Sequence, residues 1–97
     1  MKVEFTRRAV RDLTDIAARS NEQFGDRITA ALEQRIRDVI TQIGNAPEIA
    51  PRVGQLPGMR VLPLVRYPFK IFYRIVGDTV RIVHIRHTAR RPWHNRE

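Results

Sequence analysis

One stretch, Arg66–His87, restricts the fold more than any other part of this 97-residue chain. It holds two runs, Phe69–Val76 and Thr79–His87, that are rich in β-branched and aromatic residues, the types that fit a pleated, half-buried surface. Gly77 and Asp78 stand between the runs, and both tolerate positive φ, which predicts a tight two-residue turn. Because the order is Gly-Asp rather than Asp-Gly, the turn type stays open. The stretch therefore predicts a β-hairpin at the centre of a sheet.

Two amphipathic helices are predicted before this hairpin. Lys2–Phe5 alternates like a short strand, and Thr6 is a fair N-cap for the helix that follows. Apolar residues recur at helical spacing from Ala9 to Phe24 and again from Ile28 to Ile43. Only a short break at Gly25-Asp26 separates the two periodic segments. This pattern predicts an antiparallel helical hairpin.

A further strand is predicted between the helical hairpin and the β-hairpin. Residues 46–58 contain three prolines and two glycines, which indicates an irregular loop. Met59–Arg66 has the pattern of a strand, and Pro63 restricts it to an edge or a bulge. The expected order is β-α-α-β-β-β, an α+β fold in which a small, twisted antiparallel sheet carries the helical hairpin on one face. We expect a single domain over residues 1–97.

The net charge of +8 arises entirely in the second half of the chain. Residues 1–50 hold eight basic and eight acidic residues, whereas residues 51–97 hold ten basic residues and two acidic ones. A one-sided positive field attracts phosphate backbones or acidic protein partners. Sixteen of the eighteen cations are arginines, whose planar fork suits carboxylate or phosphate, although a GC-rich genome would give the same bias.

The alternation along the first run of the hairpin predicts a binding face. Lys70, Phe72 and Arg74 fall on one side of the strand, and the residues between them are expected in the core. A mixed aromatic and cationic surface suits a nucleic acid or an acidic peptide, whereas the alternative is an ordinary solvated sheet face. Trp93 is a candidate anchor for the basic tail. The predicted basic face, which is the candidate binding surface for a target or a partner, comprises Arg60, Arg66, Lys70, Arg74, Arg81, Arg86, Arg90 and Arg91.

The sequence offers few groups for catalysis and no metal site. His84 and His87 are three residues apart on a predicted strand, so they point to opposite faces and cannot both bind one metal ion. No nucleophile motif, glycine-rich phosphate loop or paired carboxylates occur, and we expect no cofactor. His87 is a candidate general acid or base. The alternative is a polar residue at a strand end, fixed by a backbone hydrogen bond.

The composition also bears on where in the cell the protein is expected. The chain has no cysteine, which fits a reducing environment, and its first residues lack the apolar run of a signal peptide. No segment approaches the roughly 20 apolar residues of a membrane span. We expect a soluble cytoplasmic protein with no membrane partner.

One set of residues resembles a known family. The chain opens with a V-x-F strand, and its first helix has Ala9 and Leu13 four residues apart. Together with the segment Gly58–Pro92, these features resemble the RelE/ParE superfamily, the toxins of type II toxin–antitoxin systems. The resemblance is closest to the ParE branch of plasmid-stabilisation toxins and implies a twisted antiparallel sheet with an N-terminal helical hairpin. Its specific part is the series Arg60, Arg66-Tyr67-Pro68, Tyr73-Arg74-Ile75, Ile85, His87 and Arg90.

The resemblance implies one of two activities. ParE-like members inhibit DNA gyrase, whereas RelE-like members are ribosome-dependent mRNA endonucleases that need no metal. Two strand lysines of RelE would fall near Val61 and Pro63, neither of which can replace them, and the tail tyrosine of RelE has no equivalent. A ribonuclease would therefore rely on Lys70, His87 and Arg90. The resemblance favours gyrase inhibition, without chemistry of the chain's own, over mRNA cleavage.

The resemblance also implies a partner. Antitoxins of this superfamily, such as ParD, wrap the toxin with an acidic, amphipathic C-terminal segment that folds on binding. A basic sheet and an apolar groove along the helical hairpin suit such a segment. DNA would then be contacted only indirectly, through the antitoxin. A third alternative is a family member that is no longer toxic and only binds its partner.

Overall fold

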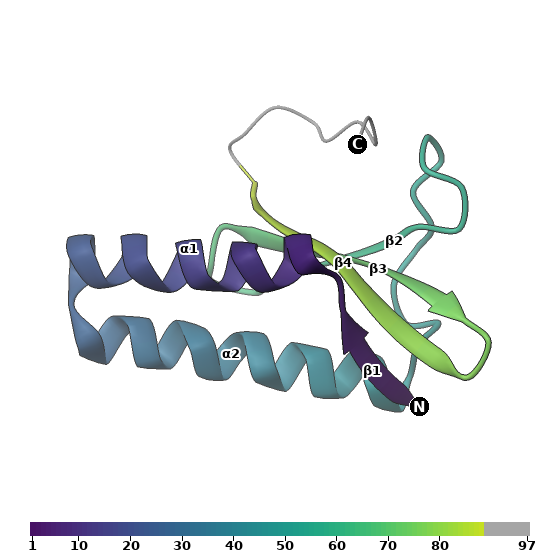
Figure 1. Cartoon of the computed structure of the whole chain (residues 1–97), viewed down its shortest axis with the longest axis horizontal. Coiled ribbons are helices and arrows are strands. Elements are labelled where there is room, and N and C mark those ends of the chain that lie inside the picture. Colours follow the sequence, from purple (N-terminus) through teal and green to yellow (C-terminus); the bar gives the residue numbers. More distant parts are fainter. Residues whose placement is uncertain (89–97) are drawn as a thin grey trace.

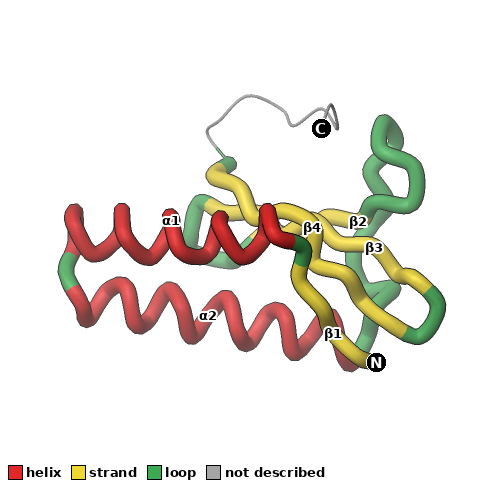
Figure 2. Tube along the Cα trace, viewed as in Figure 1, coloured by secondary structure: helices red, strands yellow, loops and turns green. Residues whose placement is uncertain are grey.

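The computed structural model describes residues 1–88, and within them the elements follow the expected order (Figure 1). Figure 2 shows the two helices running side by side, with the strands gathered at one end of the helical pair. The α+β fold predicted from the sequence is confirmed. The elements are β1 (Lys2–Phe5), α1 (Arg7–Phe24), α2 (Asp26–Asn45), β2 (Arg60–Pro63), β3 (Phe69–Val76) and β4 (Thr79–His87).

The four strands form one mixed sheet in the order β1-β4-β3-β2. β3 pairs antiparallel with both β4 and β2, as the predicted hairpin requires. β1 instead runs parallel to β4, with Val3 opposite Val80, so the expectation of a wholly antiparallel sheet is wrong for this pair. The long connection between the two strands allows this, because a chain that passes through helices can return in the same direction. Pro63 lies in β2, an edge strand, as predicted.

The helices begin and end where the local sequence predicts. The Thr6 side chain caps α1, with its Oγ1 accepting a hydrogen bond from the Ala9 N–H at 3.1 Å. Gly25 separates the helices at φ 84° and ψ −179°, a backbone conformation that is essentially confined to glycine. Thr29 of α2 donates a buried hydrogen bond of 2.8 Å to the Ser20 hydroxyl of α1. The helical hairpin is thus fixed by polar contacts as well as by apolar packing.

The main core lies between the helices and the facing side of the sheet. Tyr73 of β3 and Ile82 of β4 are opposite one another and are both fully buried. Burying an aliphatic or aromatic side chain of this size stabilises the fold by roughly 1.5–3 kcal/mol. The register between β3 and β4 shifts between Phe72 and Tyr73. The buried apolar residues of this core are Ala9, Leu32, Ile36, Val39, Ile43, Ala50, Leu64, Ile71, Tyr73, Val80, Ile82 and Ile85.

A smaller core lies on the other side of β3. There Phe72 packs with Leu56 and Met59 of the loop before β2, and all three are buried. Val61 and Val83 pack against this cluster from the neighbouring strands. The prediction that Phe72 belongs to an open aromatic and cationic surface is therefore wrong. The loop rich in proline and glycine, residues 46–58, covers this face of the sheet and shields the Phe72 ring from solvent.

Candidate functional site

Four of the predicted cations lie on the side of the sheet that faces away from the main core. Lys70 is directly opposite Arg86, and Arg74 is directly opposite Arg81. All four share the side of Phe72, because side chains two residues apart on a strand point the same way. Like charges directly opposite one another destabilise a sheet. The structure thus places two pairs of cations opposite one another on the same face of the sheet.

Arg81 has a counter-charge on the neighbouring strand. Arg81 Nε lies 2.6 Å from Glu4 Oε1 of the neighbouring strand β1. Glu4 is also opposite Arg81 in the parallel register. Both side chains are nearly half exposed, so this ion pair is screened by solvent. It still lowers the net charge at the Arg74–Arg81 end of the face.

Two of the other predicted cations, Arg60 and Arg66, are not brought onto this face. Arg60 is opposite Tyr73, so it points to the main-core side, where its guanidinium donates to the Ala50 carbonyl at 2.6 Å. Arg66 is exposed in the turn before β3, at φ 79°. The predicted Arg90 and Arg91 of the basic face, and the predicted anchor Trp93, lie outside the described residues.

Tyr73 and Arg60 hold the loop that follows α2. The Tyr73 hydroxyl donates to the Pro47 carbonyl at 2.7 Å. Burial raises the pKa of this phenol above its usual value of 10.0, although the Ala50 backbone and the Arg60 charge oppose the shift. Tyr73 is therefore a neutral structural donor at physiological pH, and it holds the loop start rather than taking part in proton transfer.

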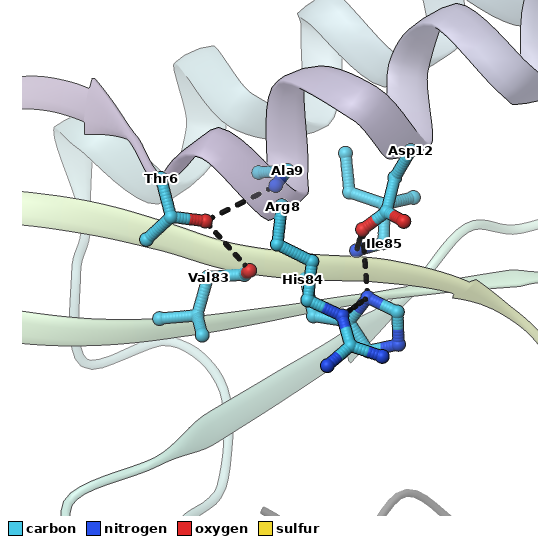
Figure 3. Close-up of polar contacts among 7 residues, drawn as sticks. All are labelled: Thr6, Arg8, Ala9, Asp12, Val83, His84 and Ile85. Atoms are coloured by element: carbon cyan, nitrogen blue, oxygen red, sulfur yellow. Dashed lines mark hydrogen bonds and ion pairs between the residues drawn. The ribbon is translucent and has the colours of Figure 1, made fainter. Parts of the chain in front are cut away.

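A polar cluster that sequence reasoning missed joins α1 to β4 (Figure 3). Asp12 Oδ2 lies 2.7 Å from His84 Nδ1 and accepts the backbone N–H of Ile85 at 2.9 Å. Arg8, one helical turn before Asp12, reaches past β4 so that its guanidinium lies beside the His84 ring, with Nε 3.2 Å from Nδ1. The His84 ring stacks on Phe72 with ring centroids 6.0 Å apart. His84 as a whole residue is only 7% exposed.

Only one of the two contacts to His84 Nδ1 is a hydrogen bond at any one time. A protonated Nδ1 donates to Asp12, whereas an unprotonated Nδ1 accepts from Arg8. We place the proton on Nδ1, because the contact to the Asp12 carboxylate is the shorter and a carboxylate is a strong acceptor. With the proton on Nδ1, the Arg8 guanidinium lies beside the ring as a positive charge and does not donate a hydrogen bond to Nδ1. Asp12 thus fixes the imidazole, and Arg8 adds a positive charge from the helix to the strand face.

The first turns of α1 replace β1 along the edge of β4. β1 ends at Phe5, and the backbone N–H of Thr6 donates to the Ile82 carbonyl at 3.0 Å. The Thr6 hydroxyl donates to the Val83 carbonyl at 2.8 Å, and Asp12 accepts from Ile85 further along. These contacts satisfy backbone groups of β4 beyond the end of its parallel partner. The four-residue spacing of Arg8 and Asp12 was visible in the sequence, but nothing there indicated which strand they would meet.

The three candidate residues for ribonuclease chemistry do not converge. Phe69 is opposite His87, and the Phe69 ring meets the imidazole edge-on, with centroids 5.3 Å apart. Lys70 is the next residue on β3, so its side chain points to the opposite side of the sheet from Phe69. Arg90 lies outside the described residues. Residues 1–88 thus show no shared face for Lys70 and His87.

Neither a metal site nor a membrane-spanning helix is found in the described part of the chain. Among residues 1–88, no group of three or more His, Cys, Asp or Glu side chains is placed to hold a metal ion. None of the helices in this range combines the length and the apolar character that crossing a membrane requires. The arrangement offers fixed positive charge and a buried, oriented imidazole.

Comparison with known proteins identifies the family. The family model described as the ParE toxin of the type II toxin–antitoxin system parDE matches residues 3–92. The chain belongs to the ParE toxin family. A solved structure of the chromosomal ParDE system of P. aeruginosa is similar to this ParE-family chain, with a TM-score of 0.81 and 27% identity over 90% of this chain and 95% of the other. A search of curated proteins finds no match.

RelE-type proteins share the ParE-family fold with lower similarity. The RelBE2 toxin–antitoxin complex of Mycobacterium tuberculosis has a TM-score of 0.63 and 24% identity, covering 89% of this chain and 95% of the other. The isolated RelE toxin of E. coli has a TM-score of 0.60 and 13% identity, covering 93% and 86%. At these identities the likeness shows the fold alone. The comparisons agree with the resemblance on which the sequence-based prediction relied.

Proposed function

We propose that this ParE-family toxin inhibits DNA gyrase by binding it, without chemistry of its own, and is neutralised by an acidic antitoxin. The observation that carries the proposal is the match to the ParE family over residues 3–92. The arrangement of the sheet supports it, because the cations of β3 and β4 share a face while the candidate general base His87 is opposite Phe69. A positively charged face on which the candidate general base does not lie suits binding better than phosphodiester cleavage.

Two further features argue against cleavage. The imidazole that the structure does orient, His84, is 7% exposed, stacked on Phe72 and fixed by Asp12. The positions near which the resemblance to RelE would place two lysines hold Val61 and Pro63. Val61 packs against the small core, and Pro63 lies at the sheet edge, so neither supplies a charge to a reacting phosphate.

The antitoxin partner is supported by the relatives and by the charge. The P. aeruginosa structure belongs to a ParDE toxin–antitoxin system, and the E. coli RelBE structure is an intact toxin–antitoxin complex. In this chain the cross-strand pairs Lys70–Arg86 and Arg74–Arg81 concentrate positive charge on one face. An acidic segment that folds on binding would be complementary in charge to this face.

The test is to add the purified full chain to a gyrase supercoiling assay and to a cell-free translation reaction. We expect supercoiling to be inhibited and translation to continue. The variant His87→Ala should inhibit gyrase as strongly as the parent, because the proposal gives that imidazole no chemical role. A stop in translation with cleaved mRNA, abolished by His87→Ala, would overturn the proposal in favour of a ribonuclease. No effect in either assay would overturn it in favour of a chain that only binds a partner.

A further inference from the structure

Arg66, in the turn between β2 and β3, has a backbone conformation that residues with a side chain rarely adopt. Its φ is 79°, and within residues 1–88 it is the one residue other than glycine with a positive φ. At the three other such positions the described chain has glycine, namely Gly25, Gly58 and Gly77. A side chain in this conformation costs free energy, because its Cβ crowds the following carbonyl oxygen. Glycine or asparagine would therefore suit the fold better than arginine at this position.

Contacts on both sides of the turn impose the conformation of Arg66. The Leu64 N–H donates to the Phe69 carbonyl at 2.9 Å, and the Phe69 N–H donates to the Tyr67 carbonyl, also at 2.9 Å. Leu64 is buried in the main core, and Tyr67 and Phe69 pack against that core. None of these contacts involves the Arg66 side chain. The turn thus requires the positive φ, but it does not require the guanidinium.

The turn displays a cation together with apolar surface. Arg66 is exposed, and within residues 1–88 its guanidinium makes no hydrogen bond or ion pair. Val65 beside it is 63% exposed, and Pro68 is exposed as well. The flanking contacts already fix the backbone that carries these side chains. Binding to such a turn loses less conformational freedom than binding to a mobile loop.

We infer that the Arg66 turn, residues 65–68, is a contact by which the chain binds its protein target, with the Arg66 guanidinium paired to a carboxylate of that target. The inference rests on the proposed inhibition of gyrase by binding, and it deepens that proposal by naming a contact residue. The turn is separate from the sheet face that carries Lys70 and Arg74, because residues 65–68 lie outside the strands. The strained backbone is explained by what its side chain binds, since the fold itself does not use that side chain.

The composition of the turn favours a protein over a nucleic acid as the partner. Arginine is enriched among the residues that contribute most to binding at protein interfaces, and those residues lie in well-packed, desolvated surroundings. Interfaces with nucleic acids are more polar and much more positively charged. Here one arginine stands beside the apolar Val65, and residues 65–68 contain no second cation. A single guanidinium pairs with one carboxylate through two parallel hydrogen bonds.

The test compares Arg66→Asn with Arg52→Asn, which removes the same charge from another exposed position. Asparagine tolerates a positive φ, so Arg66→Asn keeps the turn and removes only the guanidinium. Biolayer interferometry with the immobilised chain and gyrase holoenzyme in solution measures affinity, and the supercoiling assay measures inhibition. We expect Arg66→Asn to weaken both about tenfold, in line with the loss of one hydrogen-bonded charge pair. Arg52→Asn should change each by less than twofold.

Thermal unfolding separates a role in binding from a role in the fold. Arg66→Asn should leave the melting temperature unchanged or raise it by a few degrees, because strain is relieved and no contact of the fold is lost. A fall of several degrees, with Arg52→Asn like the parent, would show that Arg66 serves the fold and would overturn the inference.

Fluorescence anisotropy with a short labelled DNA duplex tests the other class of partner. We expect the parent and Arg66→Asn to have the same affinity for the duplex, because the inference pairs Arg66 with a carboxylate and not with a phosphate. If binding of the duplex depends on Arg66 as strongly as binding of gyrase does, the turn is assigned to nucleic acid and the inference is overturned.

The inference and the proposed function fail in different ways. If the parent inhibits gyrase and Arg66→Asn inhibits it equally, the inference is overturned and gyrase inhibition stands. If the parent leaves gyrase untouched, the gyrase proposal is overturned, and growth arrest on expression in a bacterial host decides the inference. Arrest that is lost in Arg66→Asn and kept in Arg52→Asn would support a contact to a different target. Arrest by both variants, or no arrest even by the parent, would overturn the inference.

Discussion

Asp12 and His84 lie 72 residues apart in the chain and are joined by a contact of 2.7 Å between Oδ2 and Nδ1. The same carboxylate oxygen accepts the backbone N–H of Ile85, so one side chain of α1 holds both a side chain and the backbone of β4. This contact fixes the helical hairpin to the strand that carries Arg86. The position of Arg8 against the sheet depends on the same arrangement.

Asp12→Ala should destabilise the fold by about 1–3 kcal/mol, because it leaves the Ile85 N–H and the His84 ring without their acceptor. Asp12→Asn keeps an acceptor oxygen and should cost less. Urea unfolding of the full chain measures both. Asp15→Ala, at an exposed position of the same helix, should change stability by less than about 0.5 kcal/mol. Equal losses at the two positions would contradict the role given to Asp12.

Tyr73→Phe should cost about 1 kcal/mol at neutral pH through the lost hydrogen bond to Pro47. The folded state raises the pKa of this phenol, so its contribution is complete below pH 10.0 and is lost as pH rises through the folded pKa. Stability of the parent should therefore fall more steeply above pH 10 than that of Tyr73→Phe. Unfolding measured from pH 8 to pH 11 tests this. Parallel curves for the two proteins would contradict it.

Gly25→Ala should destabilise the chain by about 1–3 kcal/mol, because the backbone between the helices has φ 84° and ψ −179°. An added Cβ would meet no atom within 4 Å, so the cost is one of backbone conformation and not of packing. Gly54→Ala is the matched control, since a Cβ there also meets nothing and its φ is not positive. Thermal unfolding of both variants should separate them by several degrees. A control that is as unstable as Gly25→Ala would refute the explanation.

Met59→Ala should cost about 2–5 kcal/mol, as is usual for truncation of a fully buried methionine. Met59 packs with Leu56 and Phe72 in the small core under the loop, so the loss should also raise proteolytic cleavage within residues 46–58. Val65→Ala, at a position that is 63% exposed, should change neither stability nor cleavage. Limited proteolysis with mass spectrometry would show whether the loop depends on this small core.

Local sequence patterns predicted the parts of the fold that depend on neighbouring residues. Thr6 caps α1, Gly25 separates the helices and Gly77, at φ 62°, forms the turn of the β-hairpin. Pro63 marks an edge strand. Each of these features follows from the backbone preference of one residue, which its position in the sequence already displays.

The parts that the sequence did not predict depend on distant contacts. Periodicity placed Phe72 on one side of β3 but could not show that Leu56 and Met59 would cover it. It likewise gave no sign that β1 would pair parallel with β4. Asp12 lies off the apolar stripe of its helix, and its spacing could not show that it would meet His84 of β4. Such contacts are set by how the layers assemble, and periodicity describes only one element at a time.

The order of the strands has a consequence for synthesis on the ribosome. β4, the last strand to emerge among residues 1–88, lies between β1, the first, and β3. Until residues 79–87 leave the exit tunnel, β1 has no neighbour in the sheet, and the main core lacks Val80, Ile82 and Ile85. A chain that is terminated before β4 therefore cannot complete this sheet. The sheet face that β3 and β4 share therefore forms only after β4 has been synthesised.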